Sequence, residues 1–248
     1  MKELMVRKGR LVGVGVGPGD PELITMKAHR RIGEADVIAY FSAVARDSNA
    51  RRIVAALLPD DRPELRLVYP VTTEALPAGV SYEQLLLDFY DESSARLAAE
   101  LDAGRDVAVL CEGDPLFFGS FMYLRNRLAD RYETEVVPGV TSVGGASSAL
   151  GMPLVCRDEQ FCALSGVLPA DELKVRLAEA DAAVVMKLGR NLAKVRTVVE
   201  ELGLIDRAWY VERATMTEQR ISRLADADAG RAPYFSMVVI PSVDAGRR

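Results

Sequence analysis

Short apolar runs alternate with helical stretches through the first half of the chain. Residues 11–16 form a β-branched run that ends in the glycine-rich turn GPGDP at 17–21, and the spacing predicts a helix over residues 22–33. A second apolar run at 37–41 completes one β-α-β unit. The same alternation continues with strands at 65–69, 107–111 and 134–137 and helices over 81–103 and 120–129. This pattern predicts an α/β fold with a mostly parallel sheet.

The pattern changes after Pro138. Residues 139–151 are rich in small side chains, which suits a closely packed helix, and Gly-Met-Pro at 151–153 then breaks the chain. We therefore expect an N-terminal α/β domain over residues 1–137 and a C-terminal α/β domain over residues 138–248. The second domain has predicted strands at 161–164, 182–186, 208–211, 218–223 and 235–240 and helices over 171–180 and 191–202. Successive strands require antiparallel pairing, so this sheet is predicted to be mixed.

Composition places the chain among ordinary globular proteins. It has 248 residues, of which 49% are hydrophobic and 27% charged, with a formal net charge of −5. The acidic balance argues against nucleic acid as a partner. No run approaches the roughly 18 apolar residues of a spanning helix, so neither a membrane anchor nor a signal peptide is expected. The three cysteines lack the short spacing of a zinc site and predict reduced thiols in the cytoplasm.

The first candidate for ligand binding is the turn that contains Gly17, Pro18, Gly19 and Asp20. Glycines at a strand-to-helix turn allow the backbone to approach a ligand closely. A dinucleotide fingerprint, however, has glycine where Pro18 stands and an acidic residue at the end of the second strand. Asp36 precedes that strand instead, so an NAD-dependent oxidoreductase is the less favoured reading, and a turn that only reverses the chain is a further alternative.

A second Gly-Asp-Pro turn, Glu112 to Pro115, follows another predicted strand. Both turns are expected at the carboxyl edge of one parallel sheet, where α/β proteins bind ligands, although Gly-Asp-Pro also favours simple turns. Thr141 and Ser142 stand where a helix begins and suit helix capping or ligand contact. Charged segments also follow two later strands, at residues 186–190 and 211–215.

Familiar catalytic arrangements are scarce. His29 is the only histidine and is read as a structural residue of the first helix, and no Ser or Cys has an obvious partner base. The acidic residues show no tight pairs at helical spacing, so no metal is expected. Arginine outnumbers lysine 25 to 6, which suits a polycarboxylate substrate, although solvated arginine surfaces are a common alternative.

Five ordered motifs together resemble the tetrapyrrole methylase family, which uses S-adenosylmethionine. They are GVGVGPGDPELIT, CEGDPLFFGS, VVPGVTS, VVMKLG and VERAT, and they extend from Gly13 to Thr215. The segments VYPVTTE at 68–74, KLGRNLAKVR and APYFSMVVIP are most similar to members that methylate the C(20) meso carbon of precorrin-2, a cobalamin precursor. The resemblance implies two αβα domains, an active-site cleft between them, a homodimer, a tetrapyrrole substrate and S-adenosylmethionine as methyl donor.

The resemblance also implies roles for individual residues. Donor contacts carried over by motif position are Pro18, Glu112, Gly113, Asp114, Phe117, Thr141, Ser142, Met186 and Ala214. At Glu112 and Ala214 the family often has glycine, so backbone contacts are expected there. The tetrapyrrole is expected near Gly17, Gly19 and Asp20. Independently of the resemblance, we hypothesise that Arg46, Arg51 and Arg52 help to hold its carboxylates.

The implied chemistry is attack of an electron-rich carbon on a sulfonium methyl group, which needs alignment and a dry pocket more than a strong base. A proton must still leave the methylated carbon, and the candidates to accept it are Asp20, Tyr69, Glu74 and Glu112. Shared motifs leave open cobalt-precorrin-2, or another precorrin position, as the acceptor.

Overall fold

The structure, a computed structural model, describes residues 7–44, 47–58, 60–71 and 79–243. The chain divides into two compact units, residues 1–141 (unit 1) and 142–248 (unit 2), and each is built on a five-stranded sheet. The expected domain boundary after Val137 falls in the short segment between the last strand of unit 1 and the first helix of unit 2.

Unit 1 contains a fully parallel sheet in the order β3-β2-β4-β1-β5. Its strands are β1 (Leu11–Gly15), β2 (Val37–Ser42), β3 (Glu64–Val68), β4 (Val107–Cys111) and β5 (Thr134–Val137). Every residue of the central strands β1 and β4 is buried, because helices cover both faces of the sheet. The predicted parallel sheet is confirmed.

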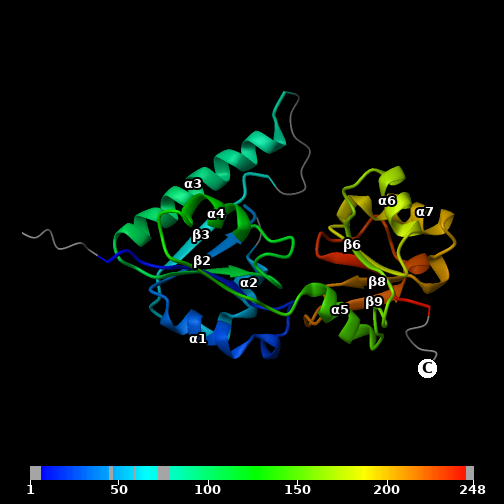
Figure 1. The fold of residues 1–248 in the computed structure, drawn as a ribbon, viewed down its shortest axis with the longest axis horizontal. Helices are drawn as coiled ribbons and strands as arrows, with labels where there is room; N and C mark the ends of the chain where they lie inside the picture. Colours follow the sequence, from blue (N-terminus) through cyan, green and yellow to red (C-terminus); the bar gives the residue numbers. More distant parts are fainter. Residues whose placement is uncertain (1–6, 45–46, 59, 72–78, 244–248) are drawn as a thin grey trace, which may run out of the picture. The chain divides into compact units, whose positions relative to one another are not determined.

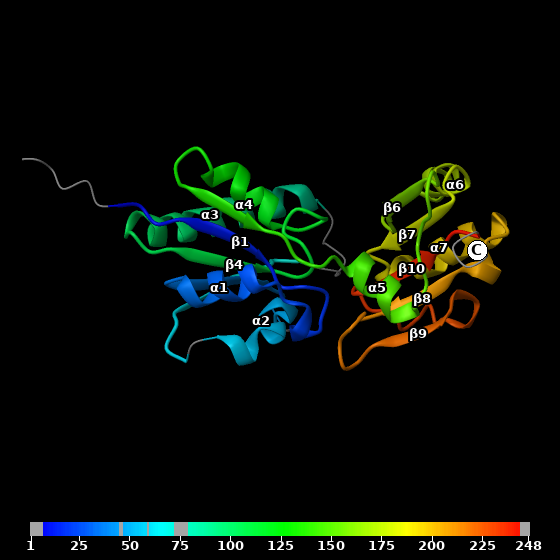
Figure 2. The same ribbon diagram turned by 60° about the horizontal axis from the view of Figure 1, so that its bottom comes forward.

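The helices of unit 1 form two layers. They are α1 (Met26–Glu34), α2 (Asn49–Ile53), α3 (Tyr82–Asp102) and α4 (Phe121–Leu128). Figures 1 and 2 show α1 and α2 on one face of the sheet and α3 and α4 on the other. The neighbouring strands β1 and β4 therefore lead to helices on opposite faces. The carboxyl ends of such a strand pair are the usual place for a ligand in an open α/β sheet.

The first helix begins later than the sequence pattern predicts. A 3₁₀ turn occupies Pro21–Leu23, Ile24 is extended, and α1 starts only at Met26. The hydroxyl of Thr25 caps the helix by accepting a hydrogen bond from the backbone N–H of Ala28 at 3.1 Å. The capping threonine sets the boundary, whereas apolar spacing alone extends the helix into the preceding turn.

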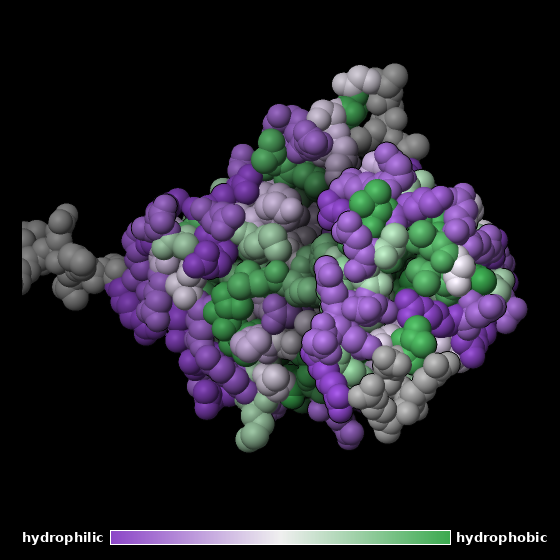
Figure 3. Space-filling model, turned by 45° about the vertical axis from the view of Figure 1, so that its right-hand side comes forward, coloured by the Kyte–Doolittle hydropathy of each residue, from purple (hydrophilic) through white to green (hydrophobic). Residues whose placement is uncertain are grey.

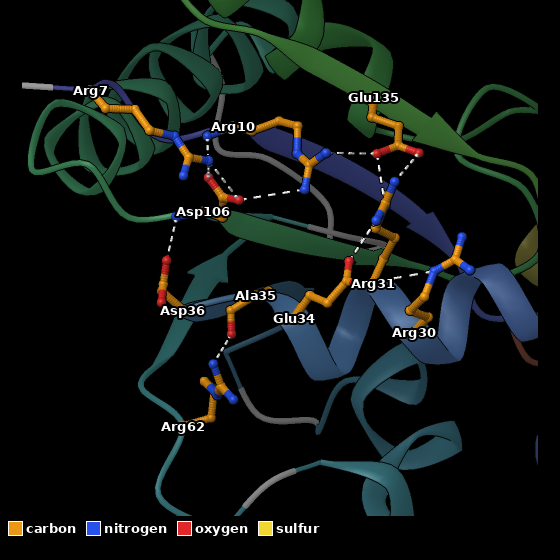
Figure 4. Close-up of polar contacts among 10 residues, drawn as sticks. All are labelled: Arg7, Arg10, Arg30, Arg31, Glu34, Ala35, Asp36, Arg62, Asp106 and Glu135. Carbon is orange, nitrogen blue, oxygen red and sulfur yellow. Dashed lines mark hydrogen bonds and ion pairs between the residues drawn. The ribbon is translucent and has the colours of Figure 1, made fainter.

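The amino ends of the unit 1 strands are joined by charged side chains (Figure 4). Asp106, before β4, accepts a hydrogen bond from the backbone N–H of Arg10 at 2.8 Å and also pairs with the Arg10 guanidinium. The carboxylate of Asp36, before β2, accepts one from the backbone N–H of Asp106, also at 2.8 Å. Glu135, in β5, contacts Arg31 at 2.8 Å. We call these residues, together with Lys27, the amino-edge network.

Glu135 illustrates the electrostatics of this network. Burial alone would raise its pKa, but hydrogen bonds from Lys27 and Arg31 outweigh that effect and lower it. The side chains of Arg31 and Glu135 are each 19% exposed, so solvent screens the pair only in part. The network therefore stabilises the ends of β1, β2, β4 and β5 at the edge of the sheet opposite the glycine turns.

Unit 2 contains a mixed sheet in the order β6-β7-β10-β8-β9. Its elements are α5 (Ser142–Leu150), β6 (Phe161–Ser165), α6 (Ala170–Ala178), β7 (Ala182–Met186), α7 (Leu192–Glu201), β8 (Trp209–Glu212), β9 (Arg220–Arg223) and β10 (Ser236–Ile240). Only β6 and β7 pair in parallel, and the other pairs are antiparallel, as the succession of strands predicts. Apolar side chains of α6 and α7 pack against this sheet to form the core of unit 2.

The surface in Figure 3 is polar over most of the face drawn, with apolar areas between the charged groups. Within the described ranges no helix combines the length and apolar character needed to cross a membrane. The three cysteines, Cys111, Cys156 and Cys162, are all free thiols.

Candidate active site

Three glycine-containing loops meet at the carboxyl edge of the unit 1 sheet. The peptide groups of Gly17, after β1, and Gly113, after β4, pair with each other, and the Gly113 N–H donates to the Gly17 carbonyl at 2.8 Å. Both residues have positive φ, 79° and 63°. The third loop follows β5 and contains Gly139. We call these loops, which follow β1, β4 and β5, the carboxyl edge.

Glycine is required where the three loops touch. A Cβ atom on Gly15 would lie 2.7 Å from the carbonyl oxygen of Gly113 and 2.5 Å from the backbone nitrogen of Gly139. A Cβ atom on Gly139 would overlap the Gly113 oxygen and lie 2.9 Å from Cα of Gly15. The glycines thus do more than reverse the chain, because they bring three backbone segments together at one place. The sequence predicts that the two Gly-Asp-Pro turns lie at one edge of the sheet, but it does not predict the approach of the β5 loop at Gly139.

The two turn aspartates have structural partners. Asp20 caps the 3₁₀ turn after β1, where its Oδ1 accepts a hydrogen bond from the N–H of Glu22 at 2.8 Å. Asp114 accepts from the N–H of Leu116 at 2.9 Å and, with its other oxygen, from the N–H of Gly139 at 3.2 Å. Turn formation is therefore a real role of both residues. Asp114 has the additional role of joining the β4 loop to the β5 loop.

The β4 loop also contains strained backbone and exposed apolar side chains. Phe118 has φ 55°, a left-handed conformation that is uncommon outside glycine, and its ring contacts that of Phe117 edge to face at 5.1 Å. Leu116 and Phe118 are both exposed. Pro18, in the neighbouring loop, is buried, and Gly19 is partly buried. Strained backbone and exposed apolar side chains in one loop are typical of a binding surface.

The carboxylate of Glu112 faces helix α2. It accepts hydrogen bonds from the backbone N–H of Ala50 and the side chain of Asn49, and it lies in the field of Arg52. Burial raises the pKa of Glu112 to about 7, and the two hydrogen bonds and Arg52 only partly oppose this. The side chain is thus directed at a neighbouring helix. The apolar pattern of the sequence does not predict α2, although Ser48, whose hydroxyl accepts a hydrogen bond from the N–H of Arg51, is an N-cap signal.

The predicted substrate arginines differ in their surroundings. Arg51 makes a bidentate ion pair with Glu64 of β3, with N–O distances of 2.8 and 3.2 Å. Hydrogen bonding to Arg51 lowers the pKa of Glu64. Arg52, on the same helix, is exposed. Arg46 lies outside the described residues. Arg51 is therefore committed to a partner within the chain.

Tyr69 belongs to an aromatic cluster at the end of β3. Its hydroxyl donates to Oγ of Ser120, and the hydroxyl of Tyr90 donates to the same oxygen at 3.1 Å. The ring of Tyr69 also contacts Phe41 and Phe89, with centroid distances of 5.5 and 4.6 Å. These contacts fix the position of Tyr69. Glu74, another candidate proton acceptor, lies outside the described residues.

Unit 2 brings its predicted site residues to one edge of its own sheet. In the sheet register Met186, the last residue of β7, is opposite Met237, and Met237 is opposite Val211. Ala214, two residues beyond the end of β8, is buried, and the N–H of the preceding Arg213 donates to the carbonyl of Phe235 at 3.0 Å. The segments after β7 and β8 therefore lie at the same edge.

Strained backbone is concentrated at this edge of unit 2. Lys187, Arg213 and Thr215 all have positive φ, 58°, 48° and 66°. These conformations are unfavourable for side chains other than glycine and are common at binding sites. No glycine or asparagine marks these positions, so the sequence held no sign of the strain.

The remaining predicted contacts are Thr141 and Ser142. Thr141 is the last residue of unit 1 and Ser142 the first residue of α5, and both are partly buried. Other reactive groups offer little chemistry. His29 is exposed on α1, Cys111 is buried with its pKa raised chiefly by burial, and no cluster of potential metal ligands occurs within the described parts of the chain.

Comparison with known proteins gives consistent matches over nearly the whole chain. The family model of the Tetrapyrrole (Corrin/Porphyrin) Methylases matches residues 10–228. A precorrin-2 C(20)-methyltransferase from a Sinorhizobium species is 50% identical, and the match covers 94% of this chain and 95% of that protein. A cobalt-precorrin-2 C(20)-methyltransferase from Salmonella typhimurium is 29% identical, with 94% and 96% covered.

One relative is much longer. The cobalamin biosynthesis protein CobIJ of Mycobacterium tuberculosis is 51% identical over 98% of this chain, which spans only 47% of that protein. Among solved structures, the uroporphyrin-III C-methyl transferase of Thermus thermophilus, complexed with S-adenyl homocysteine, matches with a TM-score of 0.65 and 28% identity. The match covers 93% of this chain and 97% of that structure.

Proposed function

Because the chain belongs to the tetrapyrrole methylase family, we propose that it transfers a methyl group from S-adenosylmethionine to the C(20) meso carbon of precorrin-2, forming precorrin-3A in cobalamin biosynthesis. The observation that carries this proposal is the 50% identity, over almost the full length of both chains, to a precorrin-2 C(20)-methyltransferase. The family and its α/β fold stand independently of the proposed acceptor.

The binding surfaces fit a methyl donor. In unit 1 the carboxyl edge offers closely packed backbone at Gly113 and the side chains of Asp114, Phe117 and Thr141. Pro18, which is buried, is proposed as a contact through the backbone of its turn. In unit 2 the proposed contacts are Ser142, Met186 and Ala214, the last two at one sheet edge. At Glu112 only the backbone remains for the donor, because its carboxylate is bonded to α2. The T. thermophilus structure, which holds S-adenyl homocysteine, supports a donor of this class.

The donor supplies an electrophilic methyl carbon, whose bond to sulfur breaks as the bond to the acceptor carbon forms and a proton leaves that carbon. The chain has to align the reactants and exclude water. Three of the candidate proton acceptors lie within the described residues, and each makes a hydrogen bond inside the chain. Asp20 bonds the N–H of a turn residue, Tyr69 bonds Ser120, and Glu112 bonds helix α2. These bonds favour a mechanism that relies on alignment, since the meso carbon is enamine-like.

For the tetrapyrrole, the exposed apolar side chains Leu116, Phe118 and Val140 offer contacts to the apolar part of the macrocycle. We propose Arg52 for its carboxylates, together with Arg46, whose surroundings lie outside the description. Arg51 is a weaker candidate for binding a substrate carboxylate, because its guanidinium is already paired with Glu64. Gly17, Gly19 and Asp20 form the adjoining turn.

Two alternatives are less favoured. Cobalt-precorrin-2 is the acceptor named for the S. typhimurium relative, whose identity to this chain is 29% against 50% for the metal-free counterpart. An NAD-dependent oxidoreductase needs an acidic residue at the carboxyl end of the second strand. Asp36 is at the opposite end of β2 and is bonded to the N–H of Asp106. We propose further that the enzyme is a cytoplasmic homodimer, as its family resemblance implies and its free thiols suit.

The decisive experiment is anaerobic incubation of the purified protein with metal-free precorrin-2 and S-adenosylmethionine labelled with ¹³C on its methyl group. We expect label at C(20), identified by NMR and mass spectrometry. A parallel incubation with cobalt-precorrin-2 identifies the preferred acceptor. Label at another carbon, or transfer only to the cobalt compound, would contradict the proposed acceptor. Failure to bind S-adenosylhomocysteine would contradict the proposed donor.

A further inference from the structure

Glu112 joins two parts of unit 1 that are distant in the sequence. It stands between the end of β4 and Gly113, whose peptide group pairs with that of Gly17. Its carboxylate accepts hydrogen bonds from Asn49 and from the backbone N–H of Ala50, the first two residues of α2. The loop proposed to contact the donor is thus bonded through one side chain to the helix that carries Arg51 and Arg52.

Helix α2 depends on such contacts for its position. It has only five residues, far fewer than an isolated helix needs in water. Ser48 caps its first turn, Arg51 binds Glu64 of β3, and Glu112 binds its amino end from β4. The contacts of Glu112 and Glu64 hold α2 against two different strands of the sheet. Arg52 follows Arg51 on this short helix, so the contacts that hold α2 also fix the position of Arg52.

We propose that Glu112 is a positioning residue that sets the affinity for the carboxylate groups of the acceptor by holding α2, and with it Arg52, against the β4 loop. The inference rests on the proposed function, because it takes the acceptor to be a polycarboxylate tetrapyrrole. In this proposal the backbone of Glu112 contacts the donor, whereas its side chain positions the helix that binds the acceptor.

The charge on Glu112 adds a pH dependence. Its pKa is about 7, so the carboxylate that accepts both hydrogen bonds is formed above this pH and is lost below it. The groups that act on it are Arg52, Asn49 and the backbone N–H of Ala50, all of α2. The thiol of the preceding residue, Cys111, stays neutral because burial raises its pKa. Acceptor binding should therefore weaken as the pH falls from 8 to 6.

The test compares Glu112→Gln with the wild-type protein. Glutamine keeps the size and one acceptor oxygen but removes the charge, so we expect the KM for precorrin-2 at pH 8 to rise about twofold, with kcat and the Kd for S-adenosylhomocysteine nearly unchanged. The dependence of KM on pH between 6 and 8 should become flatter in the variant. The exchange of the Ala50 amide hydrogen should become faster, which reports the anchor without any substrate. Glu92→Gln, at an exposed position of α3, is the matched control and should change none of these quantities.

Each outcome is informative. Faster Ala50 exchange with unchanged KM would overturn the inference and leave the proposed function intact. Unchanged exchange would show that Glu112 does not hold α2. A variant that loses donor affinity as much as acceptor affinity would assign Glu112 to the donor site instead. If the wild-type protein methylates no tetrapyrrole, the proposed function fails, and the exchange experiment still decides whether the anchor exists.

Discussion

The two edges of the unit 1 sheet use opposite means to join the same strands. At the amino edge, charged side chains from Arg10, Asp36, Asp106 and Glu135 cross from one strand to the next. At the carboxyl edge, Gly15, Gly113 and Gly139 let the backbone segments touch, with Asp114 as a single carboxylate between loops. The charged side chains at the amino edge join β1, β2, β4 and β5. The other edge keeps backbone groups and apolar side chains for ligands.

This difference predicts that stability and activity respond separately to substitutions at the two edges. Changes at the amino edge should alter the free energy of unfolding and leave catalysis intact. Changes at the carboxyl edge should alter ligand binding, and stability also where backbones touch.

The largest effect is expected from Gly139→Ala. Its Cβ would overlap the Gly113 carbonyl and crowd Gly15, so we expect a loss of about 3 kcal/mol in unfolding free energy and loss of S-adenosylhomocysteine binding. Circular dichroism and calorimetry measure these effects. The control is Gly33→Ala in α1, where nothing lies within 4 Å and helix propensity should add up to about 1 kcal/mol of stability. Normal stability of Gly139→Ala would refute the close packing of the loops.

Asp106→Ala should have the next largest effect, confined to stability. It removes the partner of the Arg10 backbone N–H and leaves a partly buried guanidinium with one partner fewer, at a cost of about 2 kcal/mol. The kcat/KM of the folded variant should equal that of the wild type. Glu201→Ala, which removes the exposed pair with Lys174, is the control and should cost less than about 0.5 kcal/mol. A fall in kcat/KM would mean that the amino edge influences the site.

Glu135→Gln tests the electrostatics of the amino edge through pH. The pKa of Glu135 is lowered in the folded protein, so its stabilising contribution is complete above the unfolded value of about 4.3 and is lost as the pH falls through the folded value. The free energy of unfolding of the wild type should exceed that of the variant by about 1 kcal/mol at pH 7, and this difference should shrink below pH 4. Thermal unfolding at pH 3, 5 and 7 measures it. A constant difference would exclude this titration as its origin.

Asp114→Asn should weaken donor binding moderately. The amide keeps an acceptor for one loop N–H but loses the charge, so the Kd for S-adenosylhomocysteine should rise about threefold to fivefold. Isothermal titration calorimetry measures the change. Asp228→Asn is the control, because Asp228 accepts a similar turn hydrogen bond from Gly230 at 2.9 Å in unit 2. If the two substitutions change the Kd for S-adenosylhomocysteine equally, the role of Asp114 is limited to forming the turn.

The smallest effect distinguishes neighbouring arginines on α2. Arg52→Ala should raise the KM for precorrin-2 about threefold with little change in kcat. Arg51→Ala should act mainly on stability, because it breaks the ion pair with Glu64, and should lower the free energy of unfolding by about 0.5 kcal/mol. Steady-state kinetics with both variants decides the assignment. If KM is unchanged in Arg52→Ala, and in Arg46→Ala as well, the arginines do not hold the substrate carboxylates.

Much of this fold follows from local sequence patterns. The apolar runs predict β1, β4 and β7 closely because every residue of these strands except Met186, at the end of β7, is buried, and the second apolar run predicts the parallel partner β2. Helix α2 was missed because five residues carry no helical period. Its stability comes from Glu112 and Glu64, which are remote in sequence. Such a helix exists only once the tertiary contacts have formed.

The candidate site likewise has features that the sequence predicts and features that it does not. Glycine and proline spacing predicts which loops meet, because close backbone approach demands those residue types. The direction of a long side chain has no such signature, so neither the turn of Glu112 toward α2 nor the pairing of Arg51 with Glu64 could be predicted. The positive φ of Lys187 and Arg213 was equally hidden, because surrounding structure imposes it on ordinary residues.

The contact among Gly15, Gly113 and Gly139 also limits how this protein can evolve. A clash between two side chains can be relieved by a second mutation that shortens one of them. Here the obstructing atoms are a backbone carbonyl oxygen, a backbone nitrogen and Cα atoms, which every amino acid possesses. Substitution at Gly15 or Gly139 therefore has no compensating partner within the contact. Variation in substrate preference has to arise in the surrounding loops while these glycines stay fixed.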